Sequence, residues 1–305
     1  MPVEARNRCQ PACLSRGEPK FGTASTVQRW LLIEQSGPWG VTALHESRIP
    51  SEVAQRIAAL ARTLGARPVL IRKPRRGRHA CRVYVGLTQA ANVWFESFEL
   101  GRPENLLELD LLPLKRAASV GGEPTARPFF LVCTHGKHDA CCAQFGRPVA
   151  SALAAEDEDN VWECSHIGGD RFAANLLCFP HGLYFGHVTP EAVKRIASLY
   201  RANRIDLEHY RGRSAYPFAV QAADWFLRRE LGIDAIDGIE LVAHDAANGN
   251  SRALFAAANG QRYLITLHVE RDPRPVLLTC RSKAAERAPR YELMSIEQQP
   301  SLDRP

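Results

Sequence analysis

The chain of 305 residues is 45% hydrophobic and 24% charged, with a formal net charge of +6, which is an ordinary composition for a globular protein. No apolar run approaches the roughly 20 residues that a membrane-spanning helix needs, and the first residues lack the apolar core of a secretory signal. We therefore expect a cytoplasmic protein without a membrane partner. Its nine cysteines are then reduced thiols or metal ligands rather than a disulfide framework.

The first third of the chain predicts a disordered tail and then an α/β region. The tail comprises residues 1–22, and we expect no role for its Cys9 and Cys13. Strands are predicted at 29–34, 68–71, 82–87 and 93–100, and a helix over 51–64 with Ser51 as its cap. The basic run at 72–78 has no interleaved aromatic residues. This favours a solvated loop over a nucleic-acid surface, so no nucleic-acid partner is expected.

The segment over 121–210 alternates strands and helices. Strands are predicted at 129–132 and 161–164, a loop from Cys133 to Cys142, helices over 148–155 and 171–177, a hairpin over 178–188 about Pro180-His181-Gly182, and a helix from Pro190 to about Arg204 that Thr189 caps. The order β-α-β-α-β-β-α is that of a thioredoxin-like domain, with a mixed sheet and flanking helices. We expect the α/β part over 23–120 to complete this sheet or to pack on it.

Residues 211–305 predict a small α+β appendage. An amphipathic helix over 217–231 precedes strands at 240–244, 251–257, 262–268 and 276–280, which Asn-Gly and Asp-Pro turn signals separate. We find no chemistry-bearing motif in this part. Its Cys280 stands apart from the other cysteines in the sequence.

The residues best suited to bind a metal fall in two short segments, each at the end of an apolar, strand-like run. Eight residues separate Cys133 from Cys142 in the first segment, and three separate His166 from Asp170 in the second. Thiolate and imidazole together favour iron, iron–sulfur clusters or zinc over magnesium or calcium. Glycines beside these residues permit tight turns and expose backbone N–H groups to sulfide. The set predicts a metal or redox site.

With Cys133-x8-Cys142, His166-x-Gly168-Gly169 and the hairpin Phe-Pro-His-Gly-Leu-Tyr-Phe-Gly at 179–186, the chain resembles the sucrase/ferredoxin-like family. That family is similar to the thioredoxin-like 2Fe–2S ferredoxins, and the resemblance covers roughly residues 23–205. Cluster-binding members have two cysteines in the first loop and His-x-x-x-His in the second. The resemblance therefore implies that Cys133, Cys142 and His166 are ligands of a 2Fe–2S cluster.

The fourth ligand position departs from the family pattern, because Asp170 stands where the second histidine would be. Three outcomes stay open: Asp170 is an oxygen ligand, Cys164 substitutes for it, or the site has lost the cluster. Asp170 could also cap a helix that starts near Arg171, or form an ion pair with Arg171. In the first segment the spacing favours Cys142 over the adjacent Cys141.

Three further histidines lie near these segments in the sequence: His135, His138 and His181. Each could be an outer-shell donor or a substitute ligand, although a solvated position is the simpler expectation.

The function implied by the resemblance is electron transfer rather than catalysis. The protein would be a thioredoxin-like ferredoxin with mixed ligands, and its partner a reductase or flavoprotein that docks on the basic surface. One alternative is a cluster-free protein of the same fold that acts by thiol chemistry or as a binding module, although no Cys-x-x-Cys pair is present. Another is a mononuclear zinc site from Cys133, Cys142, His166 and Asp170. The oligomeric state stays open.

Overall fold

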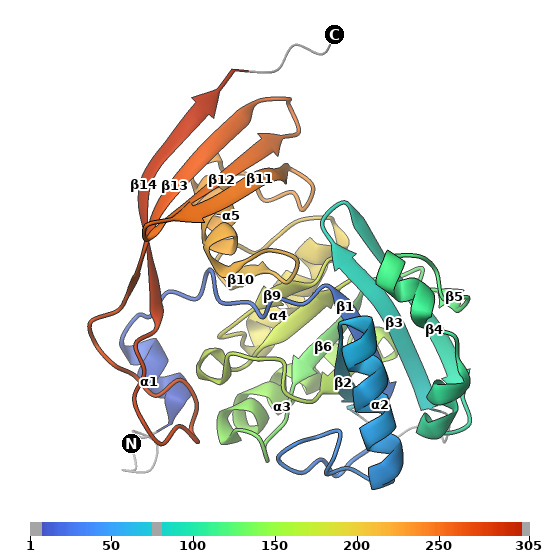
Figure 1. Cartoon of the computed structure of the whole chain (residues 1–305). Helices are drawn as coiled ribbons and strands as arrows, with labels where there is room; N and C mark the ends of the chain where they lie inside the picture. The colour runs from blue at the N-terminus through green and yellow to red at the C-terminus, as the bar shows by residue number, and fades with distance from the viewer. Residues whose placement is uncertain (1–7, 75–80, 301–305) are drawn as a thin grey trace.

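The computed structural model describes residues 8–74 and 81–300, which form two β-sheets with flanking helices (Figure 1). The larger sheet has ten strands in the order β10-β9-β8-β6-β7-β2-β1-β3-β4-β5. Its strands are β1 (Arg29–Glu34), β2 (Ala66–Arg72), β3 (Cys81–Gln89), β4 (Asn92–Leu100), β5 (Glu123–Pro124), β6 (Phe129–Cys133), β7 (Val161–Cys164), β8 (Leu176–Phe179), β9 (Leu183–Phe185) and β10 (Tyr210–Arg213). The pairs β1–β2 and β6–β7 are parallel and the other pairs antiparallel, so the predicted mixed α/β class is confirmed.

The helices cover the large sheet with apolar faces that recur at helical spacing. They are α1 (Cys9–Ser15), α2 (Ser51–Leu64), α3 (Ala140–Ala154), α4 (Pro190–Arg201) and α5 (Phe218–Leu231), with short 3-10 turns η2 (Pro103–Glu108), η3 (Leu112–Arg116), η4 (Glu158–Asn160) and η5 (Asp170–Phe172). Ile57 and Leu64 of α2 share a core with Leu31 of β1, whereas Val149 of α3 and Ile196 of α4 share another with β6 and β8. These helices thereby cover one face of the sheet, and the side chains of its other face, such as Trp30, Phe129 and Phe179, form a separate core among the strands.

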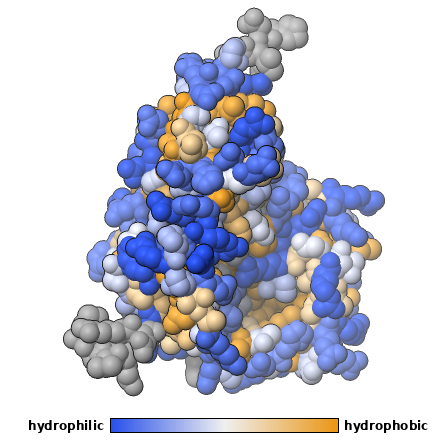
Figure 2. Space-filling model, turned by 60° about the vertical axis from the view of Figure 1, so that its left-hand side comes forward, coloured by the Kyte–Doolittle hydropathy of each residue, from blue (hydrophilic) through white to orange (hydrophobic). Residues whose placement is uncertain are grey.

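The second sheet is antiparallel and lies within the predicted C-terminal appendage. It consists of β11 (Ile239–Ala247), β12 (Asn250–Ala257), β13 (Arg262–Arg271) and β14 (Pro289–Gln299). Helix α5 packs on it through a core that includes Val220, Leu227 and Phe255. Figure 2 shows a mostly hydrophilic face of the molecule, with apolar side chains visible between hydrophilic ones over this sheet at the top. The division of the chain into domains at 23, 121 and 211 stays a prediction.

Several predicted elements are confirmed at their boundaries. Strands 29–34 and 161–164, helix 51–64 and the hairpin about Pro180 are present as expected. Thr189 caps α4, since its Oγ1 accepts the N–H of Ala192 at 3.2 Å. Ser51, however, is the first residue of α2 and Pro50 occupies the cap position. None of the helices in 8–74 and 81–300 is long and apolar enough to cross a bilayer.

Other predictions were wrong. The tail over 8–22 is not disordered but forms α1, and both Cys9 and Cys13 are buried. Helix 171–177 is a single 3-10 turn followed by β8, and 276–280 is not a strand, since β14 supplies the fourth strand of the second sheet. The predicted loop at 72–78 and the tail at 1–7 lie largely or wholly outside the described residues.

Candidate metal centre

The sheet topology brings the two predicted ligand segments to one edge. Strands β6 and β7 are parallel, with Cys133 paired to Cys164, so the segments that follow them leave from the same end. Cys142 lies in the first turn of α3 rather than in a loop, which corrects the prediction. The helix begins at Ala140 because the side chain of Asp139 caps it, with Oδ1 accepting the N–H of Cys141 at 2.8 Å.

All four residues predicted as ligands meet at this edge. The donor atoms of Cys133, Cys142 and His166 lie within 4.8 Å of one another. Asp170 Oδ1 lies 3.1 Å from Cys142 Sγ and 2.9 Å from His166 Nδ1. The donor atoms of His138, His166 and Asp170 also lie within 4.8 Å of one another, so His138 is a fifth candidate. We call these five residues the primary site.

The primary site has a buried side and an accessible side. Cys133, Cys142 and Asp170 are at most 1% exposed. The side chains of His138 and His166 are 32% and 24% exposed, and their rings stack with centroids 3.7 Å apart. A surface pocket of about 260 Å³ opens beside them, and its lining includes Arg67, Leu70 and Ser165 in addition to the two histidines. A group held by the site would contact solvent or a partner on its histidine side.

Close contacts in the primary site shift the pKa values of Cys133 and His166 in opposite directions. Hydrogen bonds from the thiols of Cys142 and Cys164, and then from His166, hold the pKa of Cys133 well below its ordinary value. Burial lowers the pKa of His166, but the close contacts with Asp170 and Cys133 outweigh it and raise that pKa to about 9. The lowered pKa favours the thiolate of Cys133, which is the form that binds metals, whereas His166 would release a proton on binding one.

One buried polar atom of the primary site lacks a hydrogen bond. Asp170 Oδ2 has no hydrogen-bond partner within residues 8–74 and 81–300, and His138 Nε2 lies 3.8 Å from it. An unpaired buried polar atom costs about 1–3 kcal/mol, and a bound cation would remove this cost. The alternative role of Asp170 as a helix cap is not supported, since Gly169 occupies the cap position of η5 and no side chain caps it. The donor set therefore fits a thiophilic metal or an iron–sulfur cluster.

The loop that carries His166 and Asp170 is fixed from outside. Each carbonyl from 166 to 169 accepts a hydrogen bond from a side chain. The donors are Arg67 to His166 O (3.0 Å), Ser25 to Ile167 O (2.8 Å), Arg211 to Gly168 O (3.1 Å) and Asn175 to Gly169 O (2.8 Å). No partner in the described part of the chain accepts the N–H groups of residues 167–169. Such free N–H groups are suited to hydrogen-bond the sulfurs of a cluster.

Gly169 is expected to be irreplaceable in this loop. Its φ is +80°, and a Cβ there would lie 2.3 Å from Arg211 Nη2. Gly121 is a matched control, since its φ is +82° and nothing lies within 4 Å of its Cβ position. We expect Gly121→Ala to cost about 1 kcal/mol from backbone strain and Gly169→Ala about 1–3 kcal/mol more. Urea unfolding of both variants measures the difference. Equal losses in the free energy of unfolding would show that the Arg211 side chain moves aside without cost.

The neighbouring histidine His135 positions the loop and is not a ligand. Its Nε2 donates to Gly40 O at 2.6 Å, and its Nδ1 accepts the N–H of His166 at 3.2 Å. Because both ring nitrogens are engaged, neither is available to a metal. Its predicted outer-shell placement fits these contacts, and its burial corrects the simpler expectation of a solvated side chain.

Of the three remaining candidates, Cys164 alone lies beside the predicted ligands. Arg171 does not pair with Asp170, because its Nε donates to Glu18 Oε1 at 2.6 Å. Cys164 is buried beside Cys133 and contacts its sulfur, so it stays an alternative ligand. The Cys141 sulfur lies 3.4 Å from that of Cys280, away from the predicted ligand set.

His181 lies outside the primary site, and its burial makes the stability of the fold depend on pH. Its Nδ1 lies 2.8 Å from Tyr200 Oη, and burial lowers its pKa from 6.5 to about 4. Between these values the unfolded chain holds a proton that the folded chain excludes, so stability falls as the pH falls, by up to about 3 kcal/mol. We expect His181→Asn to flatten this pH dependence in urea unfolding. The exposed His45→Asn variant is the control, and an unchanged slope for His181→Asn would refute the assignment.

Comparison with known proteins identifies the family of the chain. The family model described as sucrase/ferredoxin-like matches residues 20–212. The proteins named altered inheritance of mitochondria protein 32 from Saccharomyces kudriavzevii and Saccharomyces cerevisiae are each 28% identical to the chain over 141 residues, which is 42% of this chain and 45% of theirs. The match thus spans slightly less than half of these relatives, and no solved structure matches. Because the family model covers more than half of its length, the chain belongs to the sucrase/ferredoxin-like family.

Proposed function

We propose that the protein transfers electrons and that Cys133, Cys142, His166 and Asp170 hold a 2Fe–2S cluster. The observation that carries this proposal is the convergence of side chains from two separate segments. The donor atoms of Cys133, Cys142 and His166 lie within 4.8 Å of one another, and Asp170 Oδ1 lies 3.1 Å from Cys142 Sγ and 2.9 Å from His166 Nδ1. When bound, such a cluster takes up and releases one electron. The family description is consistent with this function.

The arrangement of strands around the primary site supports a thioredoxin-like part. Strands β6 and β7 are parallel and joined by α3, and β8 and β9 form a hairpin followed by α4. The four strands lie in the order β9-β8-β6-β7 within the large sheet. We propose that this unit is the cluster-binding domain, and that the strands from 23–120 extend its sheet.

The ligand set determines the charge of the proposed site. An oxidised 2Fe–2S core carries 2+, so two thiolates, one neutral imidazole and one carboxylate bring the total to about −1. Four thiolates would give about −2, and two histidines with two thiolates about zero. A less negative site is easier to reduce. We therefore expect a potential between those of plant-type ferredoxins and Rieske centres.

The accessible side is where a redox partner would approach. His138 and His166 border the surface pocket, whereas the cysteines lie beneath them. Arg67 lines the same pocket, and the chain has a net charge of +6. We propose that an acidic reductase or flavoprotein docks over the histidines, since opposite charge favours encounter.

Of the alternatives, thiol chemistry is the less well supported. Cys133 and Cys142 are at most 1% exposed, so a thiol substrate has no access to either sulfur. Mononuclear zinc remains consistent with the same four donors, because two sulfurs, one nitrogen and one oxygen make a four-coordinate site.

Anaerobic purification of the full chain decides between these metals. The proposal predicts a red-brown protein that contains iron and acid-labile sulfide in equal amounts, two of each per chain. Both should be lost in Cys133→Ser. A colourless protein in which Cys133→Ser removes one zinc would establish the zinc site instead.

The role of Asp170 is tested by exchanging its charge. We expect Asp170→His to retain the cluster at a higher potential, because a neutral ligand replaces a negative one, and to make the potential more dependent on pH. Asp170→Ala should give a labile cluster. Redox titration of the parent and the two variants measures these effects. If the potential were unchanged in both variants, Asp170 would not be a ligand.

A further inference from the structure

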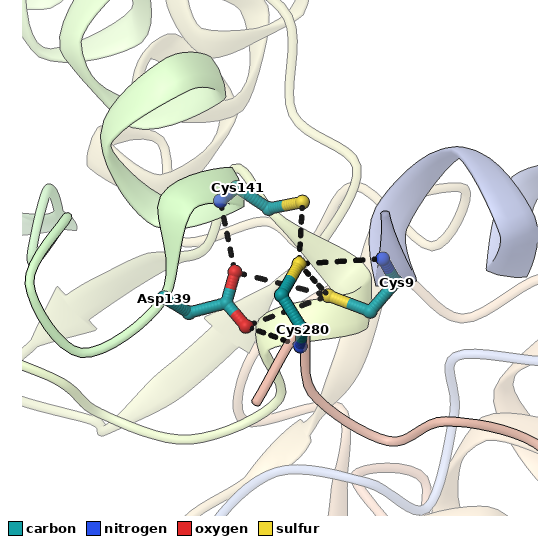
Figure 3. A group of neighbouring side chains, drawn as sticks. All are labelled: Cys9, Asp139, Cys141 and Cys280. Atoms are coloured by element: carbon teal, nitrogen blue, oxygen red, sulfur yellow. Dashed lines mark hydrogen bonds between the residues drawn. The ribbon is translucent and has the colours of Figure 1, made fainter. Parts of the chain in front are cut away.

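A second group of sulfur ligands lies beside the first turn of α3. Cys9 comes from α1, Cys141 from α3, Cys280 from the segment between β13 and β14, and Asp139 is the residue that caps α3. Their side chains point toward one another (Figure 3), and their donor atoms all lie within 4.8 Å of one another. We call this group the thiol cluster. It shares no residue with the primary site.

The spacing of the thiol cluster matches a tetrahedral metal site. The sulfur of Cys280 lies 3.3 Å from that of Cys9 and 3.4 Å from that of Cys141. Asp139 Oδ2 lies 3.7 Å from the sulfur of Cys9. Around a tetrahedral Zn²⁺, with bonds of about 2.3 Å to sulfur and 2.0 Å to oxygen, two sulfurs lie about 3.8 Å apart and a sulfur and an oxygen about 3.5 Å apart. These three pairs would reach that geometry by shifts of about half an ångström or less, and the other pairs of donor atoms lie within 4.8 Å.

Backbone groups already support the ligand atoms. The N–H of Cys280 donates to Asp139 Oδ2 at 2.7 Å, and the N–H of Cys141 donates to Asp139 Oδ1 at 2.8 Å. The N–H of Cys9 donates to the sulfur of Cys280 at 3.4 Å. Such bonds orient ligands and offset the negative charge of several thiolates. Cys9, Asp139 and Cys141 are at most 1% exposed, so water does not compete for them.

The thiol cluster joins segments that are far apart in the sequence, so a metal bound there would stabilise the fold. Cys9 and Cys280 are 271 residues apart in the sequence, and both contact the side chain of Asp139, which caps α3. In Figure 1 the segment between β13 and β14 descends from the second sheet to lie beside α1. Helix α1 has only seven residues, and so short a helix is not stable by itself. A shared ion would fasten both segments to the large sheet.

We propose that Cys9, Cys141, Cys280 and Asp139 bind one structural Zn²⁺, which fastens α1 and the segment between β13 and β14 to α3. Three thiolates and one carboxylate suit this borderline-soft ion, and four protein ligands leave no open position for catalysis. This inference is independent of the proposed electron transfer, because it uses other residues and another metal.

The test measures zinc in a protein whose primary site has lost one of its sulfur ligands. In full-length protein that carries Cys142→Ser, purified anaerobically with zinc in the medium, we expect one tightly bound zinc per chain by elemental analysis. Adding Cys9→Ser or Cys280→Ser should reduce the zinc at least about tenfold, since each removes a ligand. Adding Cys81→Ser should leave the zinc unchanged. Cys81 is the matched control because it is equally a buried cysteine, and among the described residues its thiol donates to Glu34 O alone.

Two further measurements use the same proteins. Cobalt in place of zinc should give the absorption of a tetrahedral thiolate site with Cys142→Ser alone and not after Cys280→Ser is added. Removing the metal should make the chain more sensitive to proteolysis between α1 and β1. The proposal is overturned if Cys142→Ser protein holds no zinc, if Cys280→Ser leaves the zinc in place, or if the intact mass shows the loss of two hydrogens to a disulfide within the thiol cluster.

Discussion

Replacing Cys142 by serine is expected to remove the cluster, whereas replacing the adjacent Cys141 is expected to leave it. The Cys142 sulfur lies 3.1 Å from Asp170 Oδ1 and contacts Cys133, while the Cys141 sulfur lies against Cys280. Serine is a poor ligand for iron in place of a thiolate. We expect iron per chain to fall to less than about a tenth in Cys142→Ser.

The adjacent substitution is a control for the iron, because both residues are fully buried in the first turn of the same helix. Cys141→Ser removes a proposed zinc ligand and should leave the iron in place. Visible absorption and iron analysis of anaerobically prepared proteins measure both effects. If Cys141→Ser lost the chromophore and Cys142→Ser kept it, the assignment of Cys142 rather than Cys141 as the cluster ligand would be wrong. A loss in both would point to damage to the helix itself, and circular dichroism would detect it.

Arg211→Met is expected to have the largest effect on stability. Arg211 is 1% exposed, and its guanidinium donates to Gly168 O at 3.1 Å, to Asn175 Oδ1 at 2.7 Å and to Thr23 Oγ1 at 3.0 Å. Methionine fills much of the space but leaves these acceptors buried without donors. At about 1–3 kcal/mol for each such group, with partial relaxation, we expect a loss of about 3–5 kcal/mol.

The same substitution should loosen the ligand loop, because Arg211 contacts it through Gly168. Urea unfolding and the rate of iron loss to a chelator measure the two effects. Arg252→Met is the control, since Arg252 is exposed and pairs with the exposed Asp245, and it should cost at most about 1 kcal/mol. An Arg211→Met protein as stable as the control, with the parent's rate of iron loss, would contradict the account of how the loop is held.

The regular elements were predictable where the pattern was local. Buried residues of α2 recur at helical spacing, from Ala54 to Leu64, and β1 is a short apolar run. The start of α3 was missed because Pro148 is typical of a first helical turn, whereas in the structure it lies inside the helix. The capping signal was present at Asp139, directly before the first residue of α3.

The proximity of the primary-site residues was largely predictable, since the two segments that carry them follow strands that are parallel neighbours in the structure. The side chains that hold the loop of His166 and Asp170 in place could not be predicted. Arg211 reaches the loop from β10, which was not predicted as a strand, and Ser25 reaches it from a segment 142 residues away. The thiol cluster could not be predicted either, because a separation of 271 residues between Cys9 and Cys280 leaves no local pattern.

The central claim, a cluster held by cysteines and one histidine, is tested most directly by pulsed electron paramagnetic resonance of the reduced protein with ¹⁵N-labelled histidine. The account predicts a paramagnetic 2Fe–2S signal coupled to the imidazole nitrogen of His166. That coupling should disappear in His166→Cys, which can retain a cluster, and persist in His138→Ala. A signal without histidine coupling, or no cluster signal from anaerobic protein that contains iron and sulfide, would contradict the account.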